Sequence, residues 1–230
     1  IQSTYQLGLA NSISSIFIAL VSPFLGAIAD RGSAKKKLLI TFAFLGVLMT
    51  ASLWFVEQGE WQLAVFFYVI ATIGFMAGNI FYDSLLPAVA SREKVDYVSA
   101  LGYSLGYLGG GSLFAVNVLM YLHPDWFGIP DSSTAIRISF LTVAIWWAVF
   151  TLPIIIFLPE PKSSNSVPLS KAVFSGISQL RETYDNIREM KIIGTFLLAF
   201  WLYEDGVATI VRMAGKIASS LGFAAGDIII

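Results

Sequence analysis

Long stretches without a charged residue alternate with short polar loops along the whole sequence. Residues 1–29 carry no charge, and further charge-free runs occupy 38–56, 61–82, 97–122 and 138–158, followed by a shorter one at 192–203. An α-helix needs about 20 apolar residues to cross a hydrocarbon layer of about 30 Å. The sequence therefore predicts an all-α fold, a polytopic transmembrane helix bundle.

The composition and the motifs that the sequence lacks narrow the function. Hydrophobic residues make up 57% of the chain and charged residues 13%, which is typical of membrane proteins. The chain has no cysteine, and its one histidine, His123, lies in a predicted outer loop. The sequence therefore predicts no metal site and no cofactor, and no phosphate-binding loop or nucleophile elbow indicates an enzyme. No basic groove with interleaved aromatic residues indicates a nucleic-acid partner.

Lys and Arg residues lie mostly in every second loop. The loops at 30–37, 88–96 and 159–191 carry them. The two loops between these contain acidic residues and no Lys or Arg, apart from Arg137 at the far end of the second. Short positively charged loops stay in the cytoplasm. The three basic loops are therefore predicted to be cytoplasmic, in an integral multi-pass protein of the plasma membrane of a bacterium.

This alternation predicts six membrane spans, at residues 5–29, 37–56, 62–87, 96–122, 137–158 and 191–215, with a seventh beginning near residue 224. The first span would run from outside to inside, so we expect a helix before it and a chain that is an internal fragment of a larger bundle. Residues 159–166 have the composition of a flexible linker. After them, 169–190 has apolar residues at three- and four-residue steps, which predicts an amphipathic helix at the cytoplasmic membrane face.

The first basic loop contains a recognisable motif, formed by Gly26, Asp30, Arg31 and Lys35. Here the chain resembles the major facilitator superfamily, whose signature joins its second and third helices and reads Gly-x-x-x-Asp-Arg-x-Gly-Arg-Lys. Ser33 and Ala34 depart from that signature. The resemblance implies a conformational latch on the cytoplasmic side. The alternative is an ordinary positively charged inner loop.

Three further stretches, 79–87, 98–111 and 203–207, resemble the "unknown major facilitator" branch, which is related to the autophagy-linked vacuolar amino-acid effluxer of yeast. The resemblance implies a secondary transporter that moves a small solute, with amino acids as the first expectation, by alternating access. It also implies three parts: helices two to six in 1–158, a cytoplasmic linker in 159–190, and helix seven with the start of helix eight in 191–230. A proton is the expected coupling ion.

Polar and charged side chains inside predicted spans are candidates for contact with the solute or the coupling ion, because such residues usually face the bundle interior. Glu204 and Asp205 lie midway along the sixth span, and Arg212 follows about two helical turns later on the same face. Asn11 and Ser15 share one face of the first span. Structural alternatives are an ion pair for the charged residues and a hydrogen bond from the serine to its own helix.

Asn79 and Asp83 lie one helical turn apart on a single face of the third span. Asp83 precedes Pro87 by four residues and is therefore near the cytoplasmic end. It is expected to pair with the latch, through Lys35 or Arg31, with contact to the solute or simple interfacial polarity as alternatives.

Glycines recur at every fourth position of the fourth span, at Gly102, Gly106 and Gly110. Small residues at this spacing allow two membrane helices to pack closely, and glycine also permits bending. The prediction is helix packing, either static or as part of alternating access. The span lacks the Gly-Pro step of the family's antiporter signature, so antiport is not inferred.

Two classes of function remain open. The first is the transporter, with a small solute and the lipid bilayer as its partners. The second is a membrane scaffold or sensor of the same fold that does not transport, for which the polar residues would face other helices and not a water-filled cavity.

Overall fold

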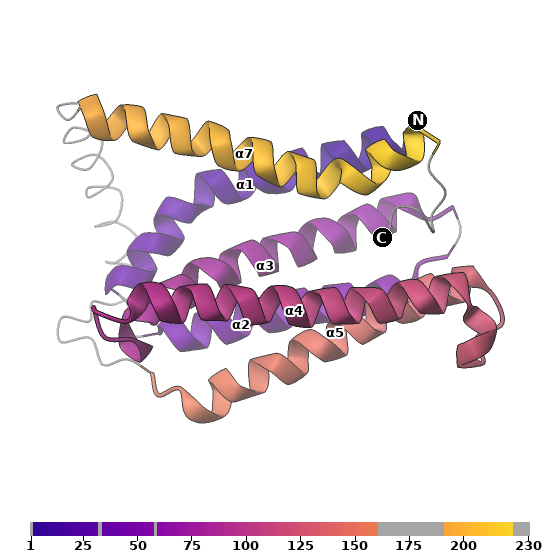
Figure 1. Cartoon of the computed structure of the whole chain (residues 1–230), viewed down its shortest axis with the longest axis horizontal. Coiled ribbons are helices and arrows are strands. Elements are labelled where there is room, and N and C mark those ends of the chain that lie inside the picture. Colours follow the sequence, from indigo (N-terminus) through magenta and orange to yellow (C-terminus); the bar gives the residue numbers. More distant parts are fainter. Residues whose placement is uncertain (1, 32–33, 58, 161–190, 223–230) are drawn as a thin grey trace. The chain divides into compact units, whose positions relative to one another are not determined.

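The computed structural model describes residues 2–31, 34–57, 59–160 and 191–222, and Figure 1 shows their arrangement. The chain divides into two compact units, Ile1–Gly176 and Ile177–Ile230, and each is considered by itself. The predicted amphipathic helix in 169–190 and the predicted start of a seventh span near 224 lie outside the described residues.

All regular structure in the described residues is helical, which confirms the predicted fold class. The first unit contains α1 (Gln2–Arg31), α2 (Lys35–Ser52), α3 (Trp61–Val89), α4 (Val95–Leu122) and α5 (Ser132–Phe157), with short 3₁₀ turns η1 (Leu53–Phe55) and η2 (Pro124–Phe127). The second unit contains α7 (Lys191–Ser220). Pro87, expected at the end of a helix, lies two residues before the end of α3.

Among the described residues, five helices are long and apolar enough to cross a membrane: Gly8–Gly26, Lys35–Phe55, Trp61–Val89, Val95–Leu122 and Ser132–Phe157. They coincide with the first five predicted spans. The sixth predicted span lies within α7, which is helical but is not among these five.

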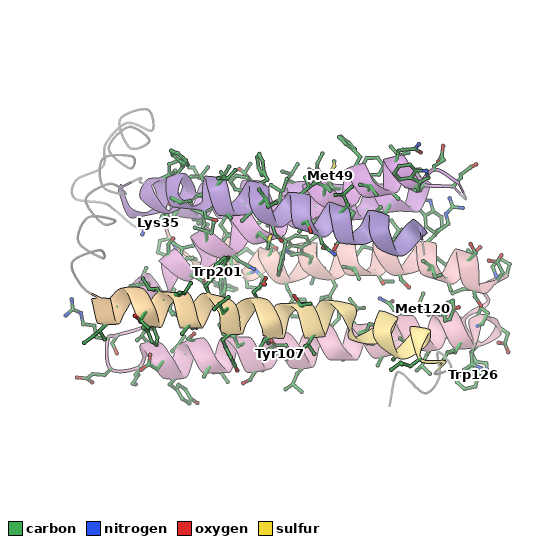
Figure 2. The ribbon with its side chains drawn as sticks, turned by 90° about the horizontal axis from the view of Figure 1, so that it is seen from above. Lys35, Met49, Tyr107, Met120, Trp126 and Trp201 are labelled. Carbon is green, nitrogen blue, oxygen red and sulfur yellow. The ribbon has the colours of Figure 1, made fainter. Side chains whose placement is uncertain are left out.

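The connections between α1, α2, α3, α4 and α5 alternate between the two ends of the first unit (Figure 1). Figure 2 shows Lys35, from the first basic loop, at one end and Trp126, from a predicted outer loop, at the other. One end of the first unit, which we call the basic end, therefore holds the α1–α2 and α3–α4 connections and the C-terminal end of α5. This grouping is the one that the charge pattern predicts.

The core lies where α1, α2 and α3 meet near the basic end. Its buried residues are Ile18, Leu25, Ala29, Leu39, Ala77, Phe81 and Leu85. Phe81 is fully buried and stacks on Phe42, with ring centroids 5.9 Å apart. Apolar contacts of this kind fix the position of α3, which carries the polar residues considered below.

Two glycines allow α2, α3 and α5 to approach closely. A Cβ atom on Gly74 would lie 2.8 Å from the backbone N of Gly46 and 2.8 Å from the backbone O of Phe42. A Cβ atom on Gly46 would lie 2.1 Å from the ring of Trp147. Real Cβ atoms do not approach other atoms so closely, so position 74 requires glycine because its neighbours are backbone atoms, whereas a larger residue at position 46 would displace the Trp147 ring. The α2–α3 crossing is thus a contact between backbones.

In contrast, α4 has few contacts within its unit. It packs mainly against α5 and only sparsely against α3. The side chains of Asn117 and Thr142 join α4 to α5 through a hydrogen bond of 2.8 Å, donated by the threonine hydroxyl. Met120 is the one residue of α4 that is buried within the described structure. One side of α4 is therefore held by α5, and most of its surface is open.

Asp131 begins α5 as its N-cap. Its carboxylate accepts hydrogen bonds from the Thr134 backbone N at 2.8 Å and from the Thr134 hydroxyl at 3.1 Å. The backbone hydrogen bond lowers the pKa of Asp131 below its ordinary value of 3.8. A lowered pKa in the folded state means that the charged form is the form that stabilises the helix.

We therefore expect Asp131→Ala to lower the thermal midpoint of the intact protein above pH 5, because the helix loses its cap. The contribution of Asp131 is fully present above its ordinary pKa and disappears as the pH falls through the lowered pKa. Thermal unfolding in detergent over a series of pH values measures this. A midpoint difference that stays constant down to the lowest pH would contradict the capping role of the charge.

Candidate functional site

A groove of about 860 Å³ opens between α3, α4 and α5. Its walls are largely apolar and include Leu39 from α2, Leu86 from α3, Val98 from α4 and Ile154 from α5. All these residues lie on segments near the basic end of the bundle. With Phe75 of α3 and Gly111 of α4 also in its lining, the groove therefore extends from the end that is predicted to face the cytoplasm to about the middle of these two helices.

Polar groups converge on this groove from α3 and α4. Asn79, Tyr82 and Asp83 line it from α3, and Ser99 and Tyr103 line it from α4. Asp83 lies six residues before the end of α3, or about 9 Å from it at about 1.5 Å per residue. A carboxylate inside a membrane span is costly unless it meets water or a partner, and the groove supplies the access that such a carboxylate needs.

The structure thus brings together Asn79 and Asp83, as the sequence predicts, on a face that lines a cavity. Both side chains are exposed in the described structure. Asn79 offers an amide donor and acceptor, and Asp83 offers a carboxylate acceptor. The pair can bind a solute that carries a hydrogen-bond donor or a positive charge.

Glycines shape the α4 wall of the groove. Gly102, Gly106 and Gly110 all line it. A Cβ atom on Gly106 or Gly110 would meet nothing within 4 Å, and one on Gly102 would lie 3.4 Å from the Tyr82 hydroxyl. Within the described residues these glycines keep the groove wide, and the helix packing predicted for them stays a prediction.

The residues of the predicted latch lie at the basic end. Gly26, Asp30 and Arg31 are in the last turns of α1, and the side chains of Asp30 and Arg31 lie outside the described part of the structure. Lys35 Nζ donates to the backbone O of Ser84 at 3.3 Å. Lys35 therefore reaches Ser84, the residue next to Asp83. The described side chains of Lys35 and Asp83 form no ion pair with each other. The latch itself stays a prediction.

In the described part of the chain, the predicted polar residues of α1 do not line the groove. Asn11 Oδ1 accepts a hydrogen bond of 2.7 Å from the Tyr68 hydroxyl, which joins α1 to α3. Ser14 is fully buried and donates to the Ala10 backbone O. Ser15 does not line the groove of the described structure. A contact of Asn11 and Ser15 with the solute stays a prediction, and the observed contact of Asn11 is one of packing.

In the second unit, Glu204 and Asp205 are exposed on α7. Arg212 lies on the same helix, and its side chain is outside the described part of the structure. The ion pair predicted between these residues, and their role in coupling, are therefore not tested. Among the described residues, no group of three or more His, Cys, Asp or Glu side chains gathers as a metal site would require.

Some features of the site were not predicted. Tyr107 on α4 lines the groove, is 80% exposed and lies between the two ends of the helix (Figure 2). The aromatic residues of 97–107 could have indicated such a wall, since tyrosine combines an apolar ring with a hydroxyl. Glu160 lies in the stretch whose composition predicts a linker, yet its carboxylate accepts hydrogen bonds from the beginning of α2. No pattern in the sequence around Glu160 predicts its contact with α2.

Comparisons with known proteins identify the family of this chain. The family model described as "Vacuole effluxer Atg22 like" matches residues 4–229. The Bacillus subtilis protein named "Uncharacterized MFS-type transporter YxiO" is 36% identical over 230 residues, which cover 100% of this chain and 53% of that protein. No solved structure gives a significant match.

Fungal relatives are more distant. "Autophagy-related protein 22" of Yarrowia lipolytica is 21% identical over 276 residues, covering 86% of this chain and 46% of that protein. The protein of the same name from Saccharomyces cerevisiae is 25% identical over 240 residues, covering 86% and 44%. The chain spans about half the length of these relatives. The resemblance inferred from the sequence motifs is confirmed, and the chain belongs to the Atg22-like vacuole effluxer family, whose bacterial relative is named as a major-facilitator-type transporter.

Proposed function

We propose that this chain forms part of a secondary transporter that moves a small solute across a membrane by alternating access, and that the groove between α3, α4 and α5 contributes to its path. The observation that carries the proposal is a large, mostly apolar groove with a carboxylate and an amide on one wall. Membership of a family of effluxers supports transport over other uses of such a groove.

The chemistry of the groove suits a solute with both a charged and an apolar part. Asp83 attracts the positive group of a solute, and Asn79 can form hydrogen bonds with polar groups of the solute beside it. The aromatic and aliphatic walls cover an apolar side chain of the solute. Ligand sites commonly combine apolar walls with a few polar groups that set orientation. Amino acids have both parts and are the proposed solute class.

The remaining assignments are proposals of the same kind. The latch comprises Gly26, Asp30, Arg31, Lys35 and Asp83. Coupling to a proton gradient is assigned to Glu204 or Asp205, with Arg212 as the partner of the carboxylates. The protein is placed in the plasma membrane of a bacterium, with the basic loops in the cytoplasm, in agreement with the positive-inside rule.

Filling the groove tests the proposal. Gly106→Trp introduces an indole where a Cβ atom meets nothing within 4 Å, so the helix tolerates the side chain while the groove loses its space. In proteoliposomes that contain the intact protein, uptake of a mixture of radiolabelled amino acids should fall to near background.

The control is Ala115→Trp, because Ala115 is exposed on the opposite face of α4 and does not line the groove. This variant should transport as the unmodified protein does. Unchanged uptake by Gly106→Trp would remove the groove from the solute path. Failure of the unmodified protein to move any solute would favour the scaffold or sensor.

A further inference from the structure

The N-terminus of α2 and the C-terminus of α5 meet at the basic end of the bundle. A helix leaves its first backbone N–H groups and its last backbone C=O groups without partners inside the helix. Glu160, three residues after the end of α5, supplies partners for α2. Its Oε1 accepts from the Lys36 backbone N at 3.0 Å, and its Oε2 accepts from the Lys37 backbone N at 3.2 Å.

Lys36, at the same end of α2, makes the reciprocal contact with the end of α5. Lys36 Nζ donates to the backbone O of Ile155 at 2.8 Å and also to the backbone O of Leu158. These carbonyls belong to the last turn of α5 and the residue after it. Each helix end is thus capped by a side chain from the other helix end. We call this pair of contacts, made by Lys36 and Glu160, the helix-end clamp.

Within the described residues, the N-terminus of α2 has no cap from a side chain of its own segment. The N-cap position of α2 is Ala34, whose side chain makes no capping hydrogen bond. A carboxylate at a helix N-terminus is also favoured by the helix dipole, as is an ammonium group at a C-terminus. Lys35 adds a contact from α2 to the Ser84 carbonyl of α3. The start of α2 is therefore attached to α3 and to the end of α5, two of the three helices between which the groove opens.

The clamp also adjoins the groove directly. Leu39 lies one turn after Lys36 on α2, and Phe157 and Leu158 lie just before Glu160; all three line the groove. Glu160 is also the last described residue before 161–190, which lead into the second unit. A change in the clamp would therefore shift the lining residues of α5 relative to Leu39 of α2.

We propose that Glu160 is a positioning residue for transport: through the helix-end clamp it holds α2 and α5 together at the basic end and so sets the width of the groove that binds the solute. This inference rests on the proposed transport function. It assigns to Glu160 a role in tethering two helices, beyond the capping of one.

A rescue experiment separates tethering from capping. Glu160→Ala removes the cap of α2 and the Glu160 half of the tether, while Lys36 keeps its contacts with the α5 carbonyls. Glu160→Ala combined with Ala34→Asp restores a local cap for α2, because aspartate is among the preferred N-cap residues, but it does not restore the contact with Glu160. Since Glu160 binds backbone amides and Lys36 binds backbone carbonyls, the exchange Lys36→Glu with Glu160→Lys does not rebuild the clamp. All variants are made in the intact protein.

The first readout is the distance between spin labels at Thr41→Cys and Ile156→Cys, two exposed positions on α2 and α5 of a chain that has no cysteine of its own. We expect a broader distance distribution in Glu160→Ala, in the double variant with Ala34→Asp, and in the charge exchange. A distribution that returns to its original width with Ala34→Asp would overturn the tether.

The second readout is the uptake of radiolabelled amino acids in proteoliposomes. We expect KM to rise severalfold in Glu160→Ala and to stay raised with Ala34→Asp, with a smaller change in maximal rate. Loss of folded protein alone would lower the maximal rate and leave KM unchanged, and that result would overturn the positioning role.

Glu60→Ala is the matched control. Glu60 Oε2 accepts from the Glu57 backbone N at 2.9 Å within one loop at the other end of the bundle, and its removal should alter neither readout. If the unmodified protein transports nothing while the distance distribution still broadens, the proposed function fails and the clamp stands as a structural contact. A narrow distribution in every variant rejects the clamp itself.

Discussion

Replacing Gly74 with alanine is expected to lower the thermal midpoint of the protein by several degrees. The added Cβ atom would lie 2.8 Å from two backbone atoms of α2, and backbone atoms cannot rotate away as a side chain does. Excess volume in a packed interior costs about 1–3 kcal/mol, and about 1 kcal/mol corresponds to about 2–4 °C in a domain of about 150–250 residues. Thermal unfolding of the intact protein in detergent measures the shift.

Gly106→Ala is the control for this prediction. The same atom is added to the interior of a helix, but at Gly106 it meets nothing within 4 Å. Alanine has a higher helix propensity than glycine by about 0.8–1.0 kcal/mol, so the midpoint should stay the same or rise. Equal shifts at Gly74 and Gly106 would show that the α2–α3 crossing is looser than the structure indicates.

Replacing Asp83 with asparagine is expected to reduce the initial rate of solute uptake by about 10- to 100-fold. A hydrogen bond to a charged group contributes about 1.5–3 kcal/mol, and about 1.4 kcal/mol is a factor of ten. The amide keeps the size of the carboxylate and loses the charge. Uptake by proteoliposomes at a solute concentration below KM measures the effect.

Asp96→Asn is the matched substitution outside the groove. Asp96 lies in the first turn of α4, is exposed and does not line the groove, so its uptake should match that of the unmodified protein. An Asp83→Asn variant that transports at the normal rate would move the solute contact to other residues, with Glu204 and Asp205 as the next candidates.

The helices could be predicted because the lengths of the apolar runs and the positions of the charged residues determine them. A run of about 20 apolar residues that ends at charged loops has few alternatives to a membrane helix, and α3, α4 and α5 begin within five residues of their predicted positions. The shared face of Asn79 and Asp83 follows from helical periodicity alone. These features depend on local sequence.

The contacts between helices could not be predicted in the same way. Asn11 and Ser15 share a polar face of α1 that is expected to point into the bundle, but this face does not indicate which neighbour it meets, so the hydrogen bond between Asn11 and Tyr68 could not be predicted. Gly46 is a single glycine without a repeat, yet it allows Trp147 to pack against α2. Glu160 stands between two prolines, a composition that favours a linker, and its role depends on a helix more than a hundred residues earlier.

The sparse attachment of α4 has a consequence for selectivity. Because α4 is supported by α5 and touches α3 little, displacing it by a small amount breaks few contacts within the first unit. A binding wall that yields at low energetic cost discriminates poorly between ligands of different bulk. Under the transport function proposed above, we expect the groove to accept a range of solute sizes and to select among them by charge at Asp83.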